Sequence, residues 1–155
     1  MKPEPTPLPG PERRLTTVDW LALTHLTTAP DQDVRVFEAL AATLVRQARL
    51  ARQDLGATLR GVARIPFRGV AAIDDVGRKM ELCRRVARRA IHGSLLDPAP
   101  GATVFHRIGE SPPWSHNLLP VAFIGSFLFY DLAGPERTRD VDTGRAPTPE
   151  DRLPC

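Results

Sequence analysis

Apolar residues recur with helical spacing in two long stretches of the chain. In residues 33–53 they fall three or four positions apart, at Phe37, Leu40, Ala41, Leu44, Val45 and Ala48. In residues 74–92 they form a stripe of Val76, Met80, Cys83, Ala87 and Ala90, widened by Val86 and Ile91. Gly93 follows this stripe and is placed to end a helix. The pattern predicts two amphipathic helices, each with one buried face.

A third helix is expected near the start of the chain. Thr16 and Asp19 have the spacing of a capping pair, so this helix should begin at Thr16 or Thr17. The apolar residues Trp20, Leu21, Leu23 and Leu26 follow. Residues 27–33 contain a proline and two aspartates, which favour a turn. Residues 54–72 are ambiguous and fit a short helix followed by a loop around Pro66.

The region after Pro100-Gly101 has the composition of strands rather than helices. β-favouring residues predict a strand over residues 103–106 and a second over residues 121–130. Gly125 is expected to form a bulge or a close backbone approach in the second strand. A Pro-Pro-Trp loop lies between the two strands. The expected fold class is therefore α+β, a small, mainly helical domain with a short antiparallel β-element.

Prolines mark both ends of the chain. Five stand among the first eleven residues, and four more follow residue 134. Such segments favour extended, polyproline-like conformations over a packed core. We expect disordered tails at residues 1–14 and 133–155, and one domain over residues 15–132.

The net charge and the two cysteines exclude few classes of function. Lysine and arginine total 21 against 18 acidic residues, a net charge of +3, which is compatible with anionic envelope polymers or nucleic acid. Cys83 on a helix face and Cys155 in a tail predict neither a disulfide nor a metal site. No export signal or membrane-spanning run is evident. We expect synthesis in the cytoplasm, with access to a cell wall only by another delivery route.

Several short motifs occur in a recognisable order within residues 73–131. They are Gly101-Ala102-Thr103, Phe105-His106, Pro113-Trp114, Ile124-Gly125 and Phe129-Tyr130. This order resembles the C-terminal half of SleB-type cell wall hydrolases, the spore-cortex-lytic-enzyme-like family. The resemblance implies a lysozyme-like groove, glycan strands of peptidoglycan as the partner, and no cofactor or metal. It also implies substrate-binding roles for four residues: Thr103, Phe105, His106 and Trp114.

The catalytic half of the family pattern is altered. SleB-like enzymes carry their catalytic glutamate in a Glu-Ala-Arg-Gly-Glu motif between the first two helices, and the aligned position here is Thr28. A threonine hydroxyl is too weak an acid to protonate a glycosidic oxygen near neutral pH. The family's Asn-Arg pair is Arg46-Gln47 here, and its Gln-Phe-Ser loop is replaced by residues 65–68. We expect Thr28 to end the first helix and to face one groove with Phe105 and His106.

Two carboxylates could replace the missing acid. Asp31 lies close to Thr28 in sequence, and Glu110 precedes the Pro-Pro-Trp loop. Helix capping for Asp31 and a solvated loop position for Glu110 are the structural alternatives. His106 could equally be a structural histidine, and Trp114 a core residue. Whether the protein is an enzyme is therefore open at this point.

Three functions are compatible with these observations. The first is a diverged cell wall hydrolase that binds, and weakly cleaves, peptidoglycan. The second is an inactive structural or interaction protein of a phage-like particle or of the cell envelope. The third is a nucleic-acid-associated protein, suggested by the arginine-rich face of residues 74–92, for which a solvated helix face is the simpler interpretation.

Overall fold

The computed structural model describes residues 15–62 and 75–134, which form an α+β fold. Its helices are α1 (Thr17–Thr28), α2 (Val34–Leu50), α3 (Leu55–Val62) and α4 (Val76–Ile91). Its strands are β1 (Val104–Arg107), β2 (Ala122–Ile124) and β3 (Phe127–Tyr130), and a single 3-10 turn, η2 (Pro113–Ser115), lies between β1 and β2. The α+β fold class is confirmed. The expected tails lie outside the described residues, apart from Ala133 and Gly134.

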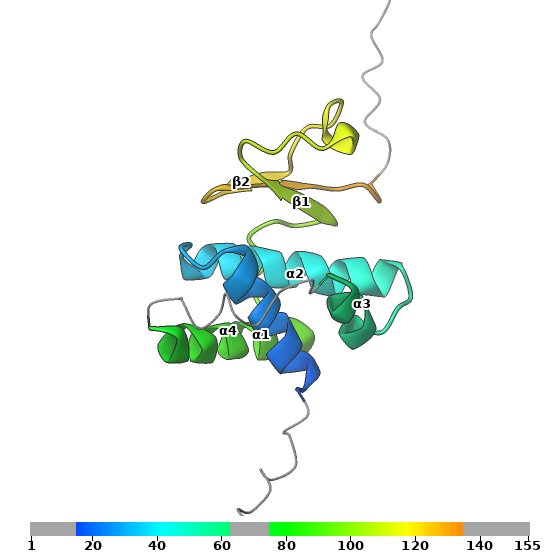
Figure 1. The fold of residues 1–155 in the computed structure, drawn as a ribbon. Coiled ribbons are helices and arrows are strands. Elements are labelled where there is room, and N and C mark those ends of the chain that lie inside the picture. The colour runs from blue at the N-terminus through cyan, green and yellow to red at the C-terminus, as the bar shows by residue number, and fades with distance from the viewer. Residues whose placement is uncertain (1–14, 63–74, 135–155) are drawn as a thin grey trace, which may run out of the picture.

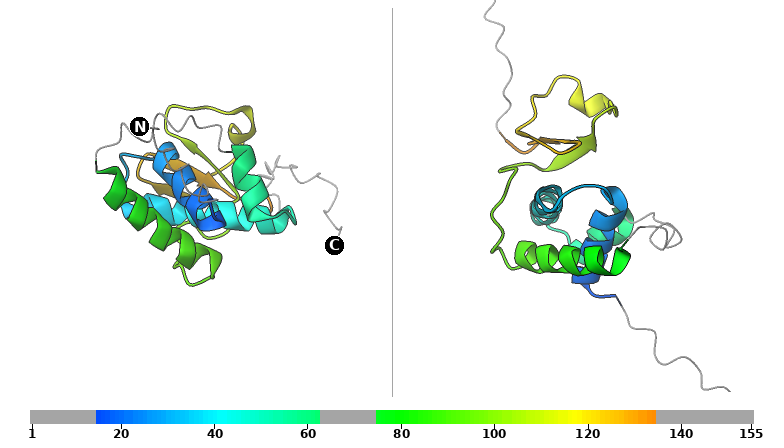
Figure 2. Two further views of the ribbon diagram at one scale, coloured as in Figure 1. Left: turned by 60° about the horizontal axis from the view of Figure 1, so that its bottom comes forward. Right: turned by 90° about the vertical axis from the view of Figure 1, so that its left-hand side faces the viewer.

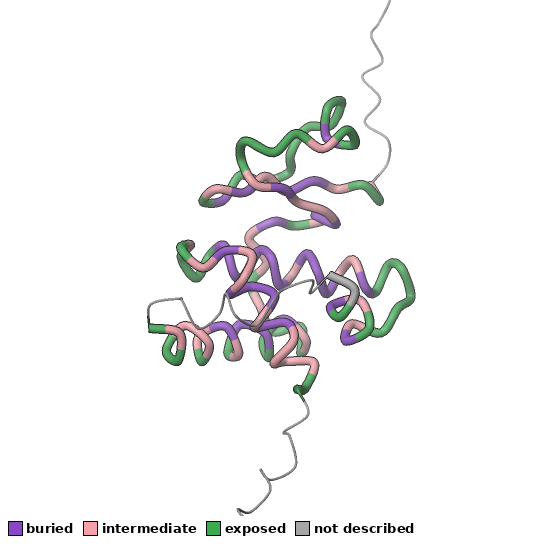
Figure 3. The backbone as a smooth tube through the Cα atoms, in the orientation of Figure 1, coloured by how far each residue is buried: buried purple, intermediate pink, exposed green. Residues whose placement is uncertain are grey.

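The elements are stacked in layers, with α2 in the middle (Figure 1). The sheet covers one side of α2, and α1 and α4 cover the other, as the end-on view of Figure 2 also shows. Coverage on both sides explains why nine of the seventeen residues of α2 are buried: Val36, Phe37, Ala39, Leu40, Ala41, Thr43, Leu44, Val45 and Ala48. The buried backbone in Figure 3 accordingly follows α2 and the elements that face it.

The predicted helix ends are largely confirmed, because local interactions determine them. The Thr16 hydroxyl accepts a hydrogen bond from the Asp19 amide at 3.2 Å, and the Asp19 carboxylate accepts one from the Thr16 amide at 2.9 Å. At the end of α4, Gly93 has a φ of +72°. Its amide and that of Ser94 donate to carbonyls of the last helical turn, at 3.2 and 2.9 Å. This double closure is the Schellman arrangement.

Cys83 occupies the buried face of α4, as the apolar stripe predicts. Burial raises the pKa of its thiol to about 11, and a protonated thiol is a poor nucleophile and a poor metal ligand. Among the described helices, none combines the length and the apolar run that a membrane crossing requires.

The sheet differs from expectation in one respect: residues 121–130 form two strands rather than one. The strand order is β1-β3-β2, with both pairs antiparallel. Gly125 and Ser126 form the two-residue turn between β2 and β3, and Gly125 has a φ of +56°. Hairpins with two-residue turns favour positive φ at this position because it matches the twist of the strands. The expected bulge is therefore a hairpin turn.

Gly125 also permits the close approach that the sequence suggested. A Cβ built on this residue would lie 2.6 Å from a methyl group of Val36 and would overlap the side-chain oxygen of Gln32. That oxygen accepts a hydrogen bond from the Ser126 amide at 3.0 Å. The hairpin turn is thus seated directly on the start of α2.

We expect Gly125→Ala to destabilise the protein by about 2 kcal/mol, through strained φ and displacement of Gln32. The loss is measurable by urea unfolding. Gly77→Ala is the matched control, because a Cβ at Gly77 in α4 meets nothing within 4 Å and alanine is the better helix former. Equal stability of the two variants would show that the turn tolerates a side chain.

Candidate functional site

The three candidate catalytic residues converge on Arg107, the last residue of β1. Its Nη2 donates to the main-chain carbonyl of Thr28 at 2.8 Å and lies 4.0 Å from Oδ1 of Asp31. Its main-chain amide donates to Oε2 of Glu110 at 3.0 Å. Thr28 is the final residue of α1, as expected. The structure therefore brings Thr28, Asp31 and Glu110 together at one end of the sheet.

Both carboxylates at this position are open to solvent. The Asp31 side chain is 66% exposed, and Glu110 is exposed as well. The general acid of a glycosidase is usually kept protonated by burial, and neither residue has that environment. Helix capping does not account for Asp31, because the residue that caps α2 is Asp33, which accepts from the amides of Arg35 and Val36 at 3.0 and 3.3 Å.

A second group of candidate residues lies on the face of the sheet that points away from the helices. We call this the outer face; the loop of residues 108–121, the outer loop, lies over it (Figures 1 and 2). There His106 stacks on Tyr130, with ring centroids 5.3 Å apart, and Trp114 packs edge-on against both rings. Trp114 remains 39% exposed, whereas His106 is 7% exposed. The indole is thus the accessible part of this aromatic cluster.

The hydrogen bonds of His106 give it a structural role in the cluster. Its Nδ1 lies 2.9 Å from the carbonyl oxygen of Arg107 and its Nε2 3.1 Å from the Tyr130 hydroxyl. A carbonyl only accepts, so Nδ1 donates to Arg107, and the second hydrogen bond joins Nε2 to the Tyr130 hydroxyl. The ring is therefore held in one orientation beneath Trp114.

The other two predicted substrate contacts, Thr103 and Phe105, present no accessible side chain on the outer face. Thr103 is buried, and its hydroxyl accepts from the Leu132 amide at 2.9 Å. Phe105 lies on the helix side of the sheet, with its ring centroid 6.0 Å from those of Phe127 and Phe129. The expectation that Phe105 and His106 line one groove is wrong, because consecutive strand residues point to opposite faces.

Arg46 has a role that sequence reasoning missed. From α2 it forms an ion pair with Asp97 and donates to the carbonyls of Ala102 and Ala99, at 2.5 and 3.5 Å. Burial lowers the pKa of Arg46, while the nearby charge of Asp131 raises it. Arg46 thus anchors the segment that leads into β1. The sequence alone had marked this residue only as a departure from the Asn-Arg pair of SleB-like enzymes.

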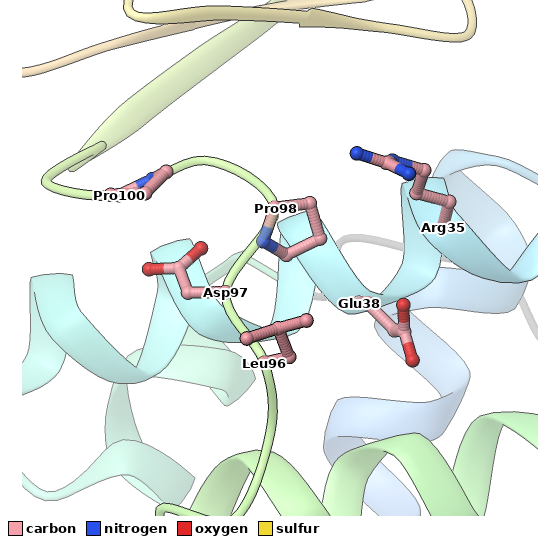
Figure 4. Close-up of a pocket in the computed structure, with 6 residues that line it drawn as sticks. All are labelled: Arg35, Glu38, Leu96, Asp97, Pro98 and Pro100. Carbon is pink, nitrogen blue, oxygen red and sulfur yellow. The ribbon is translucent and has the colours of Figure 1, made fainter.

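Beside this anchor lies an open pocket of about 410 Å³ (Figure 4). Arg35 and Glu38 of α2 line one side, and Leu96, Asp97, Pro98 and Pro100 line the other. None of the sequence-predicted site residues lines this pocket.

No family model matches this chain, and neither a curated protein nor a solved structure is similar to it.

Proposed function

We propose that this protein is a diverged SleB-like cell wall hydrolase that binds glycan strands of peptidoglycan on the outer face of its sheet. The observation that carries the proposal is the accessible indole of Trp114. It is held perpendicular to Tyr130, at an interplanar angle of 88° and a centroid distance of 5.4 Å. A rigid aromatic ring can stack on the C–H face of a sugar with little loss of conformational entropy.

In this proposal the glycan strand passes from Trp114 along the outer loop towards Arg107. Glu110 lies in the turn that closes β1, where its amide donates to the Arg107 carbonyl at 3.0 Å. A lysozyme-like groove would then end beside Thr28 and the two exposed carboxylates. Because a missing general acid removes about 10²–10⁴-fold of rate, cleavage by this protein is weak at most.

Binding to sedimented peptidoglycan tests the proposal. The unmodified protein should co-sediment and release little soluble muropeptide, and Trp114→Ala should weaken binding by about tenfold, since stacking contacts contribute roughly 1 kcal/mol or more. Leu50→Ala is the control, because Leu50 at the end of α2 is 57% exposed and belongs neither to the outer face nor to the pocket beside α2. The proposal fails if Trp114→Ala binds as tightly as the unmodified protein.

The role of position 28 can be tested by restoring the acid. Thr28→Glu should raise muropeptide release by about tenfold or more if the Arg107 end of the groove accepts the substrate. Asp31→Asn and Glu110→Gln serve as comparisons. Strong cleavage by the unmodified protein that either comparison abolishes would identify the true acid and contradict weak activity.

The second candidate function is an inactive interaction protein of a phage-like particle or of the cell envelope. It is favoured by the apolar residues that accompany Trp114 on the outer loop and β2, where Ile108, Leu119, Val121 and Phe123 are 45–67% exposed. Absence of any peptidoglycan binding would favour this candidate.

A further inference from the structure

The pocket beside α2 has one charge that lacks a partner. Glu38 accepts a hydrogen bond from Arg89 of α4 at 3.4 Å, and Asp97 is paired with Arg46. Within residues 15–62 and 75–134, the Arg35 side chain has neither an ion pair nor a hydrogen bond. Both carboxylates of the pocket are therefore compensated, and the guanidinium of Arg35 is free to bind an anion.

Apart from the paired Asp97, the opposite wall of the pocket is apolar. Pro98 and Pro100 have restricted backbones, and Leu96 extends the apolar surface (Figure 4). The Ala99 amide between the prolines donates to the Asp97 carboxylate at 2.9 Å. Arg46 holds the carbonyls of Ala99 and Ala102 from the other side. The wall is thus preorganised, which lowers the entropic cost of binding.

We infer that this pocket binds the carboxylate end of a short peptide, and specifically the stem peptide of peptidoglycan. Guanidinium and carboxylate can pair through two parallel hydrogen bonds, and the small methyl side chains of a terminal alanine fit against proline rings. A volume of about 410 Å³ lies within the usual range of small-ligand sites. The identification of the peptide rests on the proposed function, whereas the carboxylate chemistry rests on Arg35 alone.

A soluble probe tests the chemistry without any glycan. N-acetyl-D-alanyl-D-alanine should bind the full chain, and the same dipeptide with an amidated C-terminus should bind at least about tenfold more weakly, because it lacks the charge-assisted pair. Arg35→Gln should cause a similar loss for the acid form. Arg49→Gln, on the same helix but outside the pocket, should have no effect. Equal binding of acid and amide, unchanged affinity of Arg35→Gln, or no binding of the acid would each overturn the inference.

A second measurement separates this inference from the proposed function. Binding is compared on intact peptidoglycan and on glycan strands stripped of stem peptides by an amidase. Arg35→Gln should weaken binding to intact peptidoglycan only, whereas Trp114→Ala should weaken binding to both. Loss for Trp114→Ala with no effect of Arg35→Gln would refute the stem-peptide pocket and leave the glycan proposal standing. Failure of the unmodified protein to bind either material would refute both.

Discussion

Lowering the pH from 7 to 4.5 should reduce the free energy of unfolding by about 3 kcal/mol, and His25 should cause most of this loss. His25 is fully buried in α1 and stacks on Phe37 of α2, with ring centroids 6.0 Å apart. Neither ring nitrogen has a hydrogen-bond partner among the described residues. Burial lowers the pKa of His25 from 6.5 to about 3.

The direction of the effect follows from which state binds the proton. Below pH 6.5 the unfolded chain protonates His25, while the folded protein keeps the ring neutral down to about pH 3. Stability is therefore complete above pH 6.5 and is lost as the pH falls towards 3. Asp19 contributes in the same direction at lower pH: burial raises its pKa, but hydrogen bonds from Thr16 and the ion pair with Arg84 lower it more.

Urea unfolding at several pH values measures this dependence. His25→Leu, which is close in volume and cannot ionise, should flatten the stability profile between pH 4.5 and 7. His92→Gln, at an exposed residue after α4, should leave the profile unchanged. Equal acid sensitivity of His25→Leu and the unmodified protein would show that another group causes the loss.

The second large effect is expected at Arg46. Arg46→Met should reduce the free energy of unfolding by about 3 kcal/mol, because it leaves Asp97 and two carbonyls of the segment before β1 without their donor. The Arg46 and Asp97 side chains are 27% and 22% exposed, so water replaces only part of the lost interactions.

Two further variants define the source of that loss. Arg49→Met, at an exposed arginine of the same helix, should change stability by less than about 0.5 kcal/mol. The double variant Arg46→Met with Asp97→Leu should recover part of the loss, since it removes the uncompensated carboxylate as well. A loss for Arg49→Met as large as that for Arg46→Met would indicate a general effect of helix charge.

The elements that local sequence determines were predictable. The apolar stripes located α2 and α4. The Thr16–Asp19 pair located the start of α1 and Gly93 the end of α4, because each signal acts within one helical turn. The β2–β3 hairpin was missed because apolar residues continue on both sides of its turn. The Gly125-Ser126 pair between the two apolar runs is nevertheless a hairpin signal.

The site was predictable only in part, since it depends on contacts between distant residues. Family resemblance placed Thr28 at the end of α1, but its connection to Arg107 spans 79 positions of the chain. The pairing of Arg46 with Asp97 spans 51 positions. His25 was missed for a different reason. The buried residues of α1 include polar ones such as Thr24, so the spacing of its apolar residues does not indicate which polar side chains face the core.

The attachment of α1 to the sheet has a consequence for substitutions of Thr28. Arg107 holds the end of α1 through the main-chain oxygen of Thr28, an atom that every amino acid provides. The Thr28 hydroxyl makes no hydrogen bond within the described part of the chain, and the residue is only half-buried. Substitutions at this position, including Thr28→Glu, therefore keep the main-chain contact with Arg107.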